Sequence, residues 1–203
     1  MLRFIESVSY ENGVMPLIEL HQERFAQTQM AAFGKIIFDD LSVIISNNTK
    51  YFSLQNDVKY KSRIVYDAEN YEVSFHPHSK KVIKRLKIKI DNTIDYAYKY
   101  ENRVQINYLT QNLDSDTDII ILKNNLLTDA SIANIALFDG VRWYTPSKPL
   151  LRGVQRKNLL LQKKIHPRDI SIADLRNFSK IRLFNAMVSW DEAWELDTKD
   201  ISL

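Results

Sequence analysis

The sequence contains no cysteine, and it has no long apolar run. Without thiols the chain can form neither disulfides nor cysteine-based catalytic or metal sites. No segment approaches the roughly 18 consecutive apolar residues of a membrane helix. The 28 basic and 25 acidic residues nearly balance, so no charged surface points to nucleic acid or an acidic membrane. We therefore expect a soluble cytoplasmic protein that binds neither nucleic acid nor membrane.

Two further scarcities are informative. The chain has four histidines, at positions 21, 76, 78 and 166, and they show no metal-ligand spacing, so the sequence predicts no metal site. It has four glycines in 203 residues, so each is expected where a side chain would obstruct the fold. The length is sufficient for one large domain or two small ones.

Periodicity and turn residues divide the chain into an N-terminal α/β domain (1–76), a linker (77–81) and a larger C-terminal domain (82–203). The first domain is predicted to contain a strand over 2–10, a helix over 16–33, a short helix within 35–55, and a hairpin of strands 58–66 and 71–76. The second is predicted to contain strands over 85–90, 118–122, 134–138, 141–144 and 181–184, and helices over 102–113, 154–162 and 171–178. Asp139-Gly140 predicts a type I′ turn between two of these strands, and Ser171 with Asp174 predicts a helix cap.

The helix over 16–33 raises a question about Arg24. Leu17, Leu20, Arg24 and Ala31 recur at spacings of three, four and seven, so we expect them on one apolar face. A buried arginine requires an anionic partner. That partner is either a bound phosphate or a carboxylate at the edge of the core.

Residues with complementary chemistry occur at intervals through the second half of the chain. They are Lys99-Tyr-Glu-Asn-Arg103, Thr128-Asp129, Asn134, Thr145-Pro146, Gly153-Val-Gln-Arg156 and Asn185-Ala186-Met187. A lysine, a carboxylate and phosphate-binding elements suit pyridoxal phosphate (PLP). A lysine amine holds the PLP aldehyde as a Schiff base, and a carboxylate keeps the ring nitrogen protonated. An arginine or backbone N–H groups at a helix start bind the phosphate.

These blocks resemble the fold-type IV PLP enzymes, the class IV aminotransferase family, over nearly the whole chain and in the family's order. Phe4-Ile-Glu-Ser7 looks like the family's Phe-Glu-Thr start, and Leu20-His-Gln-Glu-Arg-Phe25 looks like its Leu-His-x-x-Arg-Leu helix. Lys99–Arg103 is similar to the Lys-x-x-Asn-Arg block. The Thr-Glu-x-x-x-x-Asn-Leu/Ile, Thr-Pro and Gly-Ile/Val-x-Arg blocks resemble Thr128–Ile135, Thr145-Pro146 and Gly153–Arg156.

The resemblance implies an α/β fold of the α+β type, a compact variant of the two-domain D-amino-acid aminotransferase-like architecture. It implies a homodimer with PLP between the domains and Lys99 as the catalytic residue. The implied cofactor contacts are Arg24, Lys99, Asp129, Asn134, Val154, Gln155, Asn185 and Ala186. Arg63 and Arg103 are candidates for binding substrate carboxylates. His21 is expected to orient the site.

The turn Asn185-Ala186-Met187 discriminates within the family, because aminodeoxychorismate lyases tend to have Asn-Ala-Leu/Met where aminotransferases usually have a Gly-Thr turn. We therefore expect a lyase that converts 4-amino-4-deoxychorismate to 4-aminobenzoate and pyruvate in folate biosynthesis. An aminotransferase acting on branched-chain or D-amino acids stays open. So does a non-catalytic PLP-binding or chorismate-binding protein, because Asp129 replaces the usual glutamate and Gln155 replaces the usual threonine or serine.

Overall fold

The structure is a computed structural model that describes residues 2–202, apart from the side chains of Thr49 and Phe52. The chain divides into two compact units between Ser79 and Lys80, within the range 77–81 expected for the linker. The first unit also contains Tyr98–Asn102, and the second contains Lys80–Ala97 and the residues from Arg103 onward. The C-terminal domain was expected to contain Lys99, whereas the structure assigns this lysine to the first unit.

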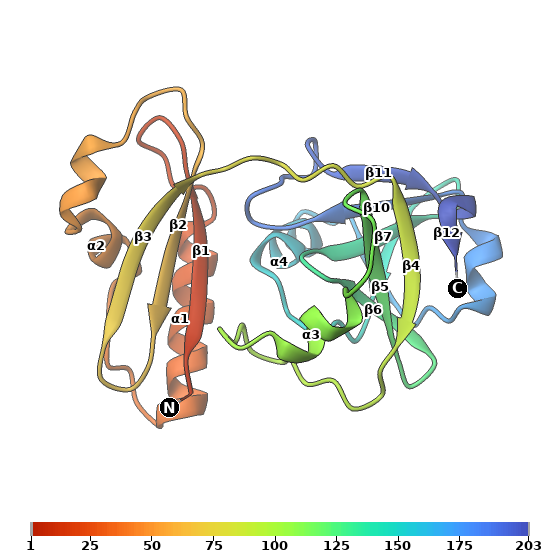
Figure 1. Cartoon of the computed structure of the whole chain (residues 1–203), viewed down its shortest axis with the longest axis horizontal. Helices are drawn as coiled ribbons and strands as arrows, with labels where there is room; N and C mark the ends of the chain where they lie inside the picture. The colour runs from red at the N-terminus through yellow and green to blue at the C-terminus, as the bar shows by residue number, and fades with distance from the viewer. Residues whose placement is uncertain (1, 203) are drawn as a thin grey trace. The chain divides into compact units, whose positions relative to one another are not determined.

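The first unit is a three-stranded antiparallel sheet with helices on one face (Figure 1). Its elements are β1 (Phe4–Tyr10), α1 (Ile18–Phe33), α2 (Leu41–Ser46), the 3-10 helix η1 (Thr49–Ser53), β2 (Tyr60–Tyr66) and β3 (Tyr71–Pro77). Side chains alternate across a strand, so Phe4 and Val8 of β1 and Ile64 of β2 share the face that packs on Phe25 of α1. This apolar face is the core of the unit.

The buried face of α1 differs from the predicted one. It consists of His21, Phe25, Thr28 and Gln29, whereas Ala31 is exposed and Arg24 lies at the edge with 14% of its side chain accessible. The prediction was wrong because it counted only apolar residues. Three buried positions are polar and have hydrogen-bond partners within the protein. The Gln29 side chain, for example, bonds backbone groups in the loop that follows the helix.

The segment Tyr98–Asn102 extends this sheet along the free side of β1, which explains why it belongs to the first unit. The Ile5 amide donates to the Lys99 carbonyl at 2.9 Å, and the Glu101 amide donates to the Arg3 carbonyl at 2.9 Å. These are the alternating backbone bonds of an antiparallel pair.

The second unit is built on a nine-stranded sheet with the order β11-β10-β7-β6-β5-β4-β12, in which β8 pairs with β7 and β9 with β8. Its strands are β4 (Arg85–Ile90), β5 (Thr117–Lys123), β6 (Leu126–Ala130), β7 (Asn134–Phe138), β8 (Trp143–Pro146), β9 (His166–Arg168), β10 (Lys180–Phe184), β11 (Trp194–Asp197) and β12 (Ile201–Ser202). Its helices are α3 (Val104–Leu109), α4 (Val154–Leu161) and the 3-10 helices η2 (Ala173–Asn177) and η3 (Thr198–Asp200). Within residues 2–202, no helix is long and apolar enough to cross a membrane.

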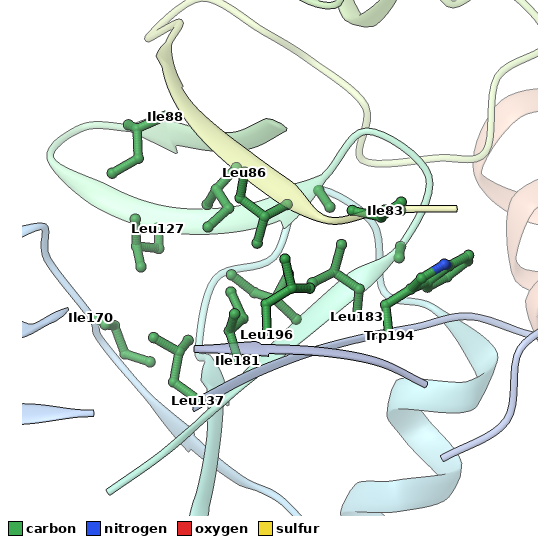
Figure 2. Close-up of a cluster of buried hydrophobic side chains, with 14 of the residues drawn as sticks. Ile83, Leu86, Ile88, Leu127, Leu137, Ile170, Ile181, Leu183, Trp194 and Leu196 are labelled. Atoms are coloured by element: carbon green, nitrogen blue, oxygen red, sulfur yellow. The ribbon is translucent and has the colours of Figure 1, made fainter. Parts of the chain in front are cut away.

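Branched aliphatic side chains from several strands form the core of the second unit. Figure 2 shows Leu86 of β4, Leu127 of β6, Leu137 of β7 and Ile181 of β10 among them. β5 is buried at six of its seven positions, as expected for a strand covered on both faces. This core fixes the β6–β7 hairpin, which positions the polar residues described below.

The expected mixed α/β class is confirmed, and the expected strands and the helices over 16–33 and 154–162 are present with small changes of boundary. The helix expected over 102–113 is shorter, because α3 covers only Val104–Leu109. The region 171–178 forms a 3-10 turn, with Ser171 bonded to the Asp174 carboxylate as predicted. The type I′ turn is wrong. Only Gly140 of the two central residues has a positive φ, because the Asp139 carboxylate accepts two backbone amides and imposes its own turn.

Candidate functional site

Asp129 and Asn134 face each other beside the turn of the β6–β7 hairpin, in antiparallel register. The Asn134 Nδ2 donates to Asp129 Oδ1 at 2.7 Å and to the Leu151 carbonyl at 2.9 Å. The Leu151 amide donates to the other carboxylate oxygen of Asp129 at 2.8 Å. The carboxylate is therefore fixed by amide donors on two sides.

The electrostatic setting of Asp129 favours a cationic ligand. Burial raises its pKa to about 6, even though the bonds from Leu151 and Asn134 and the charge of Arg156 act in the other direction. Among the described residues, Asp129 forms no ion pair. A positive charge beside this carboxylate would stabilise its ionised form.

Gly153 is required by a close approach. A Cβ atom at this position would lie 2.0 Å from Asn134 Oδ1, although the φ of −65° suits any residue. Gly153 is the N-cap of α4, and the first amides of a helix have no partner within it. Val154 and Gln155 begin the helix and are buried, so their backbone amides are suited to an anion such as the PLP phosphate.

Two motifs that lie apart in the sequence meet through Arg156. Its Nη2 donates to the Pro146 carbonyl at 2.8 Å, and its Nε donates to the Thr145 hydroxyl at 3.3 Å. The Thr-Pro block at the end of β8 therefore anchors the first turn of α4.

Asn185 organises the turn after β10. Its Oδ1 accepts the amides of Met187 at 2.8 Å and Val188 at 3.0 Å, and its Nδ2 donates to the Ile132 carbonyl at 3.0 Å. The side chain thus ties its own turn to the β6–β7 hairpin. The predicted cofactor contacts of Asn185 and Ala186 stay predictions.

In the first unit, Lys99 lies on the sheet face opposite α1. The neighbouring rings of Tyr98 and Tyr100 pack against Phe4 on the helix-covered face, so the alternation of side chains directs Lys99 to the other face. Arg63 of β2 shares this face, and its Nη2 donates to the Glu101 carboxylate at 3.0 Å.

Arg24 forms an ion pair with Glu6, which was the alternative to a bound phosphate. Its Nε and Nη2 donate to the two carboxylate oxygens of Glu6 at 2.8 and 2.5 Å. Glu6 is 1% exposed, and its Oε2 also bonds His21 Nδ1 at 2.6 Å. The buried arginine therefore has an anion within the protein, and its contact with the phosphate stays a prediction.

His21 is fully buried beside this ion pair. Burial lowers its pKa, and the charges of Arg24 and Lys99 lower it further, against the opposing effect of Glu6. A neutral ring that donates through Nδ1 leaves Nε2 as an acceptor, and Nε2 has no hydrogen-bond partner among the described residues.

Some residues of these clusters were missed by the sequence analysis. Glu6 was quoted only as part of a motif, although its place between Phe4 and Val8 on an alternating strand indicates an inward carboxylate. Leu151 acts through its backbone amide and carbonyl, which no residue identity reveals. Glu101, the partner of Arg63, lies within the lysine block.

The groups present fit PLP. The chain offers a lysine amine, a buried carboxylate with no cation in direct contact, and the start of α4 held beside that carboxylate by the contact of Gly153 with Asn134. Within residues 2–202, no cluster of three or more histidine, cysteine, aspartate or glutamate side chains could hold a metal ion. The convergence of Lys99 and Asp129 on one ligand stays a prediction.

Comparison with known proteins identifies the relatives of this chain. The family described as amino-transferase class IV matches residues 3–191. An uncharacterised protein of Haemophilus influenzae is 35% identical over 190 residues, covering 92% of this chain and 98% of that protein.

Solved structures agree with this result. One from Haemophilus somnus 129PT, named "putative 4-amino-4-deoxychorismate lyase", is 33% identical with a TM-score of 0.85, covering 93% of this chain and 98% of its own. A PLP-bound hypothetical aminotransferase from Mycobacterium tuberculosis has the same fold, at 14% identity and a TM-score of 0.76, covering 98% of this chain and 82% of its own. The chain belongs to the class IV aminotransferase family, and it is a PLP-dependent lyase or aminotransferase.

Proposed function

We propose that this enzyme is a lyase that converts 4-amino-4-deoxychorismate to 4-aminobenzoate and pyruvate. The proposal is carried by the likeness to the Haemophilus somnus structure, which is named for this reaction and matches almost the full length of both chains. The turn Asn185-Ala186-Met187 supports it, because the Asn185 side chain builds this turn and bonds the hairpin that contains Asp129. By the same likeness we propose a cytoplasmic homodimer that acts in folate biosynthesis.

The proposed roles follow from the chemistry of each residue. When bound, PLP supplies an electron sink. Lys99 would hold the cofactor through its side-chain amine, and the same amine would be the base that removes the proton from the substrate carbon bearing the amino group. Asp129 holds the ring nitrogen protonated. The backbone amides of Val154 and Gln155, together with Arg24, bind the phosphate.

The reaction balances without a second substrate. Proton removal is followed by cleavage of the carbon–oxygen bond to the enolpyruvyl group, and the carbocyclic ring becomes aromatic. The leaving enolpyruvate takes up one proton at its methylene carbon and becomes pyruvate, and Lys99 is suited to return that proton. Arg63, on the same sheet face as Lys99, is the candidate for binding a substrate carboxylate.

A turnover assay tests this proposal. Purified protein is loaded with PLP and given aminodeoxychorismate made in situ, and 4-aminobenzoate and pyruvate are measured together. We expect equal amounts of both products, without any added keto acid, and neither product from the matched variant Lys99→Ala.

Two other results of this assay would indicate a different function. Transfer of an amino group to a supplied keto acid, without release of 4-aminobenzoate, would reject the lyase in favour of an aminotransferase on branched-chain or D-amino acids. PLP binding with no turnover of either kind would indicate a non-catalytic binding protein.

A further inference from the structure

The five-residue segment that contains Lys99 is attached at both ends to the second unit. The chain belongs to the second unit through Ala97, contributes Tyr98–Asn102 to the sheet of the first unit, and returns to the second unit at Arg103. Tyr96, just before this excursion, is 7% exposed. The position of Lys99 therefore depends on how the two ends of the segment are fixed.

Arg103 contacts Tyr96, which lies just before the Lys99 segment, and the turn of the β6–β7 hairpin. Its guanidinium carbon lies 6.0 Å from the centroid of the Tyr96 ring, within the range of a cation–π interaction. Its Nη2 donates to the Ser131 carbonyl at 2.5 Å. Its Nε is buried and has no hydrogen-bond partner among the residues that the structure describes. Two of the guanidinium nitrogens are thus occupied or enclosed by the protein itself, which favours a structural role for Arg103.

The hairpin that Arg103 holds is the one that contains the carboxylate. Ser131 lies in the tight turn between β6 and β7, closed by a bond from the Ala130 amide to the Ala133 carbonyl at 2.9 Å. Asp129 immediately precedes this turn and Asn134 immediately follows it. Arg103 is therefore the direct physical link between the ends of the lysine segment and the Asp129–Asn134 pair.

We propose that Arg103 is a positioning residue that anchors the chain on both sides of the Lys99 segment to the Asp129 hairpin, and that it does not bind the substrate. This inference rests on the proposed roles of Lys99 and Asp129. An arginine is suited to the task, because its planar guanidinium stacks on a ring and donates to a carbonyl at the same time, which a lysine ammonium does less well.

Arg103→Met tests the proposal, because it keeps an unbranched side chain of similar reach and removes the donors. Arg142→Met is the matched control, since Arg142 is exposed and lies in the turn between β7 and β8. Without cofactor, hydrogen exchange should become faster in residues 96–103 and 129–134 of the Arg103 variant only. With PLP bound, the midpoint of a pH titration followed by cofactor absorbance should shift by about one unit, because the chain on both sides of Lys99 has lost its anchor.

Kinetics separate positioning from substrate binding. We expect kcat of Arg103→Met to fall by about 10- to 100-fold with little change in KM, because a small misplacement of a reacting group is costly. Arg103→Lys should recover part of kcat and serves as the second variant if the methionine variant folds poorly. A normal exchange pattern and absorbance titration with a raised KM would overturn the inference and restore the substrate role.

Borohydride reduction followed by peptide mapping distinguishes this inference from the proposed function. If the wild-type protein is labelled at Lys99 while Arg103→Met behaves as wild type in exchange, titration and kcat, only the positioning role is rejected. If the wild-type protein has no label at Lys99, the proposed function and this inference are rejected together.

Discussion

Each unit contains one buried carboxylate beside its candidate functional residues, and the two have opposite electrostatic character. Glu6 in the first unit is 1% exposed, and Asp129 in the second is 6% exposed. Burial raises the pKa of Glu6, but the charge of Arg24 and the bonds from His21 and Arg24 outweigh it and lower the pKa to about 2. Burial raises the pKa of Asp129 to about 6.

The difference teaches that the partners of a buried acid decide its role. Glu6 has a guanidinium in direct contact, so its charge is already neutralised within the protein. Asp129 accepts bonds from the amides of Asn134 and Leu151, and Arg156 acts on it only through its charge, so the carboxylate is held in place without a cation in direct contact. The first arrangement stabilises the fold, and the second is suited to a positively charged ligand.

Removing the cation from the first pair should give the largest effect. Arg24→Met leaves Glu6 buried without its counter-ion, so we expect the free energy of unfolding to fall by about 3–5 kcal/mol. Chemical denaturation of the apoprotein measures this. The double variant Arg24→Met with Glu6→Gln should recover part of the loss, and a loss below about 1 kcal/mol in the single variant would contradict the buried ion pair.

The two acids should give opposite pH dependence of stability. The folded pKa of Glu6 is depressed, so its contribution of about 3 kcal/mol is present above pH 4.5 and lost as the pH falls through about 2. The folded pKa of Asp129 is raised, so its contribution is present below pH 3.8 and lost as the pH rises through about 6.

Denaturation of the apoprotein across this pH range measures both effects. Glu6→Gln should lower the free energy of unfolding least at acid pH. Asp129→Asn should gain in unfolding free energy relative to wild type as the pH rises from about 4 to 7. If the difference in unfolding free energy between variant and wild type changed with pH in the same direction for both variants, the two acids would not have opposite effects.

Gly153→Ala tests the packing that holds the amide donors of Asp129. The new Cβ would collide with Asn134 Oδ1, so we expect a loss of about 1–3 kcal/mol in unfolding free energy. In an Asn134→Ala background the collision partner is gone, and the cost of Gly153→Ala should fall by more than half. Equal costs in the two backgrounds would show that the contact is unimportant.

The smallest expected effect is on PLP affinity. In the apoprotein Asp129 is mostly protonated below pH 6, and it must release that proton to pair with a cation. Lowering the pH from 7 to 5 should therefore weaken binding about tenfold more in wild type than in Asp129→Asn. Parallel titrations of the two proteins with PLP measure the difference, and identical pH dependence would exclude a cation beside Asp129.

Much of the fold could be predicted from the sequence, because the alternation in β4 and the turn residues around β2 and β3 are local signals. β6 was missed because its five residues end in Thr-Asp-Ala, which lack strong strand character. The location of Lys99 could not be predicted, since pairing with β1 over more than ninety positions leaves no local pattern.

The site residues show the same limit. The lysine, carboxylate and glycine blocks were recognisable as motifs, whereas the link from Arg103 to Ser131 passes through a backbone carbonyl that any residue would provide. The partner of Arg24 illustrates a similar limit, because the sequence analysis left two possible anions and only the structure identifies Glu6 as the one in contact.

Tyr98–Asn102 belongs to the first unit but lies within the sequence of the second, which affects how the chain can be divided into fragments. A gene fragment that ends near Ser79 would encode the first sheet without the segment that borders β1, leaving the Ile5 amide without the Lys99 carbonyl. A fragment that begins at Lys80 would contain the lysine but not the strand it pairs with. A single cut in the chain therefore cannot separate the two units with all of their residues.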